Sequence, residues 1–154
     1  MSTVHDPGLH AVARVRGVRE QDSLLALQQA LATQREREEQ LAHLTQQLTA
    51  AAALEADILG ETGSPGALLT LRMTLTHLAT STRLAREEVA AAEVLTDAAR
   101  DRWEHDKSRL AAVEQLLERR TTERRREARR AEDRQTDETA AQGWLRRTTG
   151  DPHR

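Results

Sequence analysis

The sequence predicts an all-α protein: a long two-helix antiparallel coiled-coil hairpin with a charged helical extension. Three observations support this fold class. The composition is dominated by Ala, Leu, Glu, Arg and Gln, with 31% charged residues and no Phe or Tyr, which is typical of long helices rather than of a wide globular core. Glycine and proline are confined to a few places along the chain, and apolar residues recur with a seven-residue period. At 154 residues, we expect a single unit spanning 1–154.

Glycine and proline mark where the helices begin and end. Apart from Gly17, which a helix can accommodate, they lie in Pro7-Gly8, in the GETGSPG segment at 60–66, and in Gly143, Gly150 and Pro152. We therefore predict a first helix over about 9–59, a loop over 60–66, a second helix over about 67–146 and a flexible tail over 147–154. Gly60 suits a C-terminal cap, and Ser64-Pro65 supplies a capping side chain and a first-turn proline.

The second helix carries the clearest periodic signal. Its heptad positions are mostly apolar or small, and they predict a continuous seam for packing against another helix. They are Leu71, Leu75, Leu78, Thr82, Ala85, Val89, Ala92, Thr96, Ala99, Trp103, Asp106, Leu110, Val113 and Leu117. The first helix has a rougher stripe, interrupted by the polar stretch 33–40, formed by Leu24, Leu27, Leu31, Leu41, Leu44, Leu48, Leu54 and Ile58.

If the chain folds back at the loop, residues face each other when their numbers sum to about 127. This rule places Leu24 near Trp103 and Leu9 near Glu118. The seam of the second helix stops at Leu117, where the first helix runs out of chain. This coincidence favours an intramolecular hairpin, monomeric when free, over a parallel homodimer.

The stretch beyond Leu117 predicts a charged helix without a partner inside the chain. Between Glu118 and Arg134 it holds eight arginines against five acidic residues, and no apolar stripe returns until Trp144. A helix that is polar all round is either solvated or an interaction element. Because the planar guanidinium binds carboxylates well, its densest cluster is a candidate partner-binding surface: Arg119, Arg120, Arg124, Arg125 and Arg126.

No catalytic or cofactor-binding pattern is found in the sequence. The glycines form no phosphate-binding loop, cysteine is absent, and no two histidines are spaced i, i+4. We therefore predict a protein that is not an enzyme and that uses no cofactor, metal or small-molecule substrate. No stretch resembles a secretory signal or a membrane span, so we expect a cytoplasmic location.

Four stretches resemble one known family. They are Val15–Glu20 (VRGVRE), Glu38–Leu44 (EEQLAHL), Asp101–Arg120 (DRWEHDKSRLAAVEQLLERR) and Asp133–Arg147 (DRQTDETAAQGWLRR). Their order resembles the FliJ proteins of the flagellar type III export apparatus. The resemblance implies a non-catalytic stalk-like hairpin that docks into the hexameric export ATPase ring, promotes its assembly, recycles export chaperones and contacts the cytoplasmic part of the export gate. It also implies peripheral association with the cytoplasmic face of the inner membrane.

The resemblance also implies a second surface, in the middle of the hairpin, that faces the export gate, with Gln40, Leu44 and Leu78 at the matching positions. For Leu44 and Leu78, however, the sequence favours a position in the seam over a gate contact. Three alternative functions stay open from the sequence: the equivalent stalk protein of a virulence secretion system, a generic coiled-coil scaffold, and nucleic-acid binding through RRTTERRREARR. The last is disfavoured because Glu123 and Glu127 interrupt the basic face, and because the heptads precede the basic region instead of following it.

Overall fold

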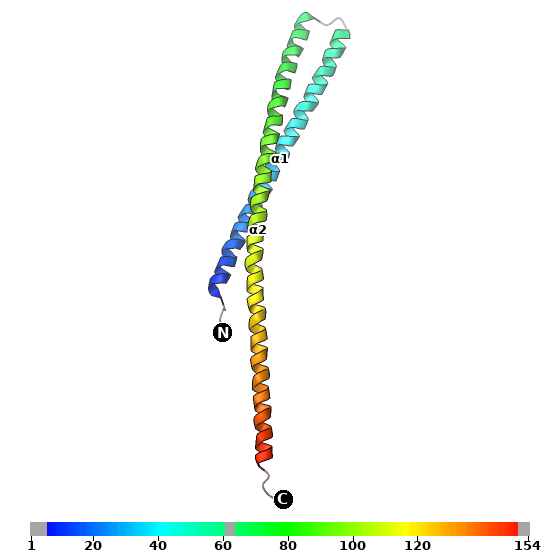
Figure 1. Ribbon diagram of the computed structural model, residues 1–154. Helices are drawn as coiled ribbons and strands as arrows, with labels where there is room; N and C mark the ends of the chain where they lie inside the picture. The colour runs from blue at the N-terminus through cyan, green and yellow to red at the C-terminus, as the bar shows by residue number, and fades with distance from the viewer. Residues whose placement is uncertain (1–5, 61–63, 151–154) are drawn as a thin grey trace. The chain divides into compact units, whose positions relative to one another are not determined.

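The computed structural model describes residues 6–60 and 64–150. Two helices, α1 (Pro7–Gly60) and α2 (Pro65–Thr149), account for nearly all of them, and this part of the chain contains no strand. The helices pack against each other as an antiparallel hairpin (Figure 1), which confirms the predicted fold class. Their contacts group into two units, which we describe separately: Gly17–Ser108, and Met1–Arg16 together with Arg109–Arg154.

The reversal lies in the unit Gly17–Ser108. Ser64 caps α2, since its Oγ accepts a hydrogen bond from the N–H of Ala67 at 3.2 Å and its carbonyl accepts one from Leu68 at 3.2 Å. Pro65 is the first residue of α2, two residues before the predicted start at about 67, because its fixed φ and missing N–H suit the first helical position. The connection is shorter than the predicted loop, as Gly60 still belongs to α1. Residues 61–63 of that loop lie outside the described residues.

The seam of α2 is confirmed within both units. All fourteen predicted positions are buried or half-buried, and nearly all the residues between them are exposed. The deepest stretch holds small or β-branched residues: Thr82, Ala85, Val89, Ala92 and Thr96. Small side chains at the seam let two helices approach closely, and here they belong to the segment facing the middle of α1.

Two of these seam residues are threonines with different hydrogen bonding. The hydroxyl of Thr82, 2% exposed, donates to the carbonyl of Leu78 at 2.7 Å. The hydroxyl of Thr96, also 2% exposed, has no hydrogen-bond partner among the described residues. A buried hydroxyl without a partner is unfavourable, so Thr96 is a weak point of the seam.

The seam of α1 follows a heptad more closely than its sequence indicates. Ser23 and Leu27 are its most buried members, at 4% and 6% exposure. The prediction for Leu54 is wrong: its side chain is 51% exposed, and the seam runs through Ala51 and Glu55 instead. The polar stretch 33–40 does not break the helix.

Polar pairs across the hairpin establish its register. The pairs are Arg72 with Glu55 at 3.2 Å, Arg37 with Glu88 at 3.1 Å, and the indole N–H of Trp103 with a carboxylate oxygen of Glu20 at 2.8 Å. The first matches the predicted pairing rule, and the other two fall within about one helical turn of it. Exposed ion pairs contribute only ~0–1 kcal/mol each, so their main effect is to favour this register over a slipped one.

Candidate functional site

In the unit formed by Met1–Arg16 and Arg109–Arg154, the residue just before α1, Asp6, has an unusual backbone conformation. This residue has a φ of 63°, in the left-handed region that aspartate tolerates better than most side chains. Its carbonyl accepts hydrogen bonds from the N–H groups of Leu9 and His10 at 3.0 and 3.1 Å. Pro7 follows as the first helical residue. The predicted start at about residue 9 is therefore two residues late.

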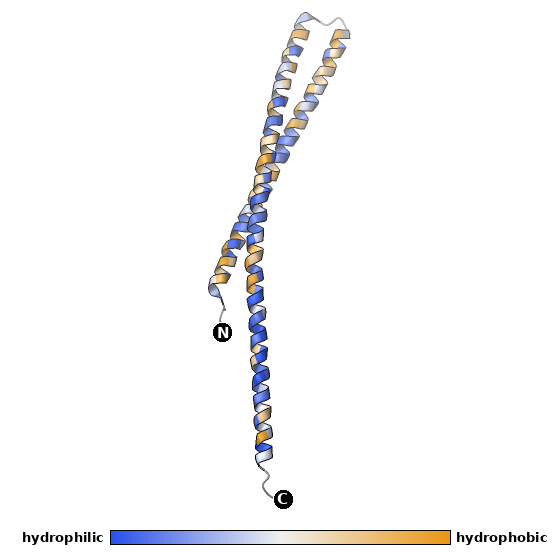
Figure 2. Ribbon diagram, viewed as in Figure 1, coloured by the Kyte–Doolittle hydropathy of each residue, from blue (hydrophilic) through white to orange (hydrophobic). Residues whose placement is uncertain are grey.

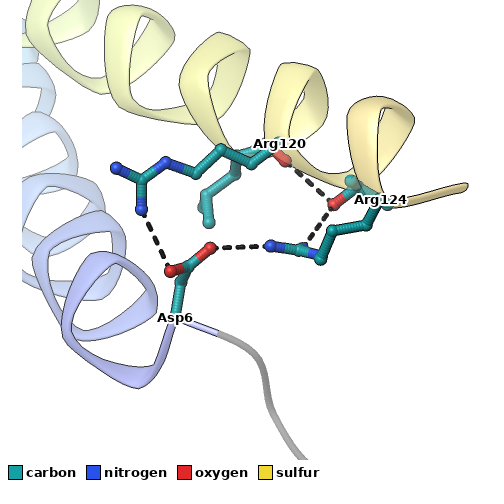
Figure 3. Close-up of polar contacts among 5 residues, drawn as sticks. Asp6, Arg120 and Arg124 are labelled. Carbon is teal, nitrogen blue, oxygen red and sulfur yellow. Dashed lines mark hydrogen bonds and ion pairs between the residues drawn. The ribbon is translucent and has the colours of Figure 1, made fainter. Parts of the chain in front are cut away.

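The side chain of Asp6 binds two arginines of α2 (Figure 3). Its Oδ1 accepts a hydrogen bond from Arg120 at 3.0 Å, and its Oδ2 accepts one from Arg124 at 2.8 Å. Arg124 also donates to the hydroxyl of Thr121 at 3.2 Å, and that hydroxyl donates to the carbonyl of Leu117 at 2.9 Å. We call the contact of Asp6 with Arg120 and Arg124 the Asp6 clasp.

The two guanidinium groups change the acidity of Asp6. The hydrogen bond from Arg124 is the main cause, and together with the positive charges of both arginines and the bond from Arg120 it holds the pKa of Asp6 below its ordinary value, against a smaller opposing effect of burial. The carboxylate therefore keeps its charge to a lower pH than an ordinary aspartate does.

The clasp corrects the expectation that α2 has no internal partner from Glu118 onwards. The seam continues past Leu117 to Thr121 and Arg124, both half-buried. The apolar periodicity could not predict this extra heptad, because its seam positions hold the polar residues Thr121 and Arg124, and Arg124 is ion-paired with Asp6. The signal that could have found it is charge complementarity, since the pairing rule places Asp6 opposite residue 121.

Beyond Arg124, α2 is exposed at almost every position up to residue 150. Figure 2 shows this part of the helix as predominantly hydrophilic, with apolar character returning near its end, where Trp144 and Leu145 are 61% and 53% exposed. The helix runs to Thr149, three residues beyond the predicted end. Of the predicted tail, residues 151–154 lie outside the described residues.

The five candidate arginines fall into two groups. Arg120 and Arg124 are engaged by Asp6. Arg119, Arg125 and Arg126 are exposed, and none of them forms an ion pair with a described residue. The structure thus brings two of the five together on one carboxylate and leaves three presented to solvent.

The candidate gate residues lie in the unit Gly17–Ser108 and are not equivalent. Gln40 is exposed and accepts a hydrogen bond from Arg37 at 3.3 Å. Leu44 and Leu78 are half-buried at seam positions. Large apolar side chains are exposed elsewhere near the reversal: Leu54, Leu59, Leu69 and Met73, with exposures of 51%, 61%, 62% and 68%. Sequence reasoning missed the last three, although each is a large apolar residue outside the heptad positions.

The described residues show few features of other site types. They contain no group of three or more His, Asp or Glu side chains arranged to hold a metal ion. Neither described helix has a segment long and apolar enough to cross a membrane. What the two units do present is an ion-paired helix end, the three exposed candidate arginines and exposed apolar side chains near the reversal. These features define a coiled-coil hairpin with surfaces suited to protein contacts.

Comparison with models of protein families shows to which family this hairpin belongs. The model of the flagellar FliJ protein family matches residues 5–149, so the chain belongs to that family and is related to flagellar protein export. The match covers both helices and includes the Asp6 clasp. Neither the curated proteins nor the solved structures yielded a significant match.

Proposed function

We propose that this protein is the non-catalytic stalk component of the flagellar export apparatus, and that the arginine-rich end of α2 contacts the export ATPase ring. One observation carries the proposal: in the arginine-rich part of α2, the candidate residues Arg119, Arg125 and Arg126 are exposed and form no ion pair with a described residue. Guanidinium groups exposed on a rigid helix can form charge-assisted hydrogen bonds with partner carboxylates. Family membership supplies the export context.

The stalk role includes promoting assembly of the ATPase hexamer and raising its activity without hydrolysing ATP itself. It places the protein in the cytoplasm, at the inner face of the membrane where the export apparatus lies. The chaperones of export substrates are further partners in this proposal. The family match favours the flagellar system over a virulence secretion system.

We assign the contact with the export gate to the stretch of the unit Gly17–Ser108 that runs from Gln40 towards the reversal. Gln40 offers an exposed polar contact partway along α1, and Leu69 and Met73 offer exposed apolar surface close to the reversal. Leu44 and Leu78 contribute to this surface only through their half-buried edges. Replacing Leu69 and Met73 with glutamine should weaken binding to the cytoplasmic part of the gate protein more than the same change at Val94, which is similarly exposed at 68% but lies in another part of the hairpin.

The ATPase contact can be tested with matched charge reversals. The purified protein should stimulate ATP hydrolysis and increase the hexamer fraction of the export ATPase. The triple variant Arg119→Glu, Arg125→Glu, Arg126→Glu should reduce both effects by at least about tenfold, because each reversed charge removes charge-assisted hydrogen bonds. Helicity should be unchanged, since all three side chains are exposed.

The control for this variant is Arg14→Glu, Arg19→Glu, Arg35→Glu. These arginines are exposed on α1 and the net charge changes equally, so this variant should retain most of the stimulation. Equal losses in the two triple variants would show that only overall charge matters. If the unaltered protein neither binds the ATPase nor stimulates it at micromolar concentrations, the stalk proposal is wrong.

A further inference from the structure

The Asp6 clasp is a complete binding site for one carboxylate. Arg120 and Arg124 are four residues apart on α2, so their side chains project from the same face of the helix. Each binds a different oxygen of Asp6, at 3.0 and 2.8 Å (Figure 3). Thr121 holds the guanidinium of Arg124 from the helix side at 3.2 Å. The two arginines are therefore arranged for a carboxylate, and the one they hold comes from the start of the same chain.

The clasp is accessible from solvent. The side chains of Arg120 and Arg124 are 46% and 35% exposed, and that of Asp6 is 26% exposed. Partly exposed ion pairs are weak and open readily. A shallow groove adjoins the clasp, and its lining holds three arginines and one carboxylate. It is lined by His10 of α1 and by Thr121, Arg124, Arg125, Glu127, Ala128, Ala131 and Arg134 of α2. An extended segment could lie in this groove and place an acidic side chain at Arg120 and Arg124.

We propose that Arg120 and Arg124 are a carboxylate-binding pair that Asp6 fills within the chain, and that an acidic segment of a partner protein displaces Asp6 from it. The inference rests on the proposed function and adds regulation to it. The exposed Arg119, Arg125 and Arg126 make the first contact, and the clasped pair is engaged only when Asp6 leaves. Asp6 is thus an internal competitor that lowers the affinity of α2 for acidic partners.

The competitor can be removed with little change in shape. The variant Asp6→Asn keeps the size of the side chain but loses its charge, so it removes both ion pairs and leaves at most a neutral hydrogen bond to one of the arginines. Apparent affinity falls in proportion to the fraction of molecules in the competent state. A clasp closed in most molecules therefore predicts that Asp6→Asn binds acidic partners about three- to tenfold more tightly.

A matched control separates this release from a change in net charge. Glu127 is exposed, lines the same groove and forms no ion pair with a described residue. Glu127→Gln removes one negative charge beside the same arginines without releasing them. It should strengthen binding by less than about twofold, in keeping with the weakness of exposed charge interactions.

The test uses the full chain with two probes, poly-L-glutamate at low ionic strength and the purified export ATPase. The expected result is tighter poly-L-glutamate binding by Asp6→Asn than by Glu127→Gln, with far-UV circular dichroism unchanged. Adding Arg120→Gln and Arg124→Gln should abolish the gain in the Asp6→Asn background, whereas the same two changes should have a small effect when Asp6 is present. Such non-additivity is the signature of direct coupling between the three residues.

The outcomes distinguish this inference from the proposed function. If Asp6→Asn binds poly-L-glutamate no better than Glu127→Gln, or if its gain survives loss of Arg120 and Arg124, internal competition is refuted. If Asp6→Asn loses helicity, Arg120→Gln and Arg124→Gln are introduced into Asp6→Glu instead, which keeps the negative charge. A small effect of these two changes on poly-L-glutamate binding supports internal competition, and a large loss of binding refutes it. Enhanced poly-L-glutamate binding without any ATPase binding would support the carboxylate site and refute the ATPase as its partner.

Discussion

Replacing Thr96 with valine should stabilise the hairpin. The Thr96 hydroxyl is buried, at 2% residue exposure, and has no hydrogen-bond partner among the described residues. Leaving a buried polar group unsatisfied costs about 1–3 kcal/mol. Valine has nearly the same shape and the same branching at Cβ, so the substitution removes that cost and leaves the packing of the seam intact. We expect the free energy of unfolding to rise by about 1 kcal/mol, the lower end of that range.

The assay is urea unfolding followed by far-UV circular dichroism. A stabilisation of this size should raise the urea midpoint at an unchanged slope, and it should raise the melting temperature by about 2–4 °C for a chain of this length. An unchanged slope matters because it shows that the surface exposed on unfolding is the same in both proteins.

The control is the equivalent change at Thr82. Its hydroxyl is equally buried but donates to the carbonyl of Leu78 at 2.7 Å. Thr82→Val therefore loses a hydrogen bond and should give no gain, or a loss of up to about 1 kcal/mol. If both variants are stabilised equally, the seam simply prefers apolar side chains. If Thr96→Val is destabilised, its hydroxyl has a partner in solution and the reasoning fails.

Three further predictions concern other parts of the hairpin. Gly17→Ala should raise the free energy of unfolding by ~0.5–1 kcal/mol in the same urea assay, because a Cβ there meets nothing within 4 Å and α1 loses a flexible glycine; a decrease would show that the position is crowded. The fluorescence of Trp103, which is half-buried and hydrogen-bonded to Glu20, should resist quenching by acrylamide, as measured in the variant Trp144→Phe. The fluorescence of Trp144, which is 61% exposed, should be quenched readily in the variant Trp103→Phe. Because the pKa of Asp6 is lowered, the stabilisation of the folded chain by the clasp should be fully present above the ordinary aspartate pKa and lost as the pH falls through the lowered pKa. An NMR titration in which the Asp6 carboxyl has an ordinary midpoint would refute the clasp.

The sequence predicted most of the fold because two signals were unambiguous. Glycine and proline are sparse enough to mark the helix ends to within a few residues. The heptad of α2 is long enough that small and polar members such as Thr82 and Asp106 could be placed by phase alone, and both lie at seam positions. Pairing across the reversal then followed from the length of the connection.

The errors arose where the pattern is degenerate or charged. Residues 50–53 are four consecutive alanines, which fit every helical phase, so the heptad of α1 could not be carried through to choose between Leu54 and Glu55. The Asp6 clasp was missed because a charged residue outside an expected helix carries no periodic signal. Which arginines of α2 are held and which are exposed depends on a single side chain more than a hundred positions away, and only the folded structure shows it.

The cross-helix polar contacts also imply an order of folding. Their sequence separations increase steadily away from the reversal, with values of 17, 51, 83 and 114 residues for Arg72–Glu55, Arg37–Glu88, Trp103–Glu20 and Arg120–Asp6. Direct closure of the longest loop is entropically costly, but each contact formed nearer the turn shortens the remaining loop. The hairpin should therefore zip outward from Ser64, with the Asp6 clasp forming last and fraying first. Among the described residues, a partner that opens the clasp has no other cross-helix hydrogen bond or ion pair to break first.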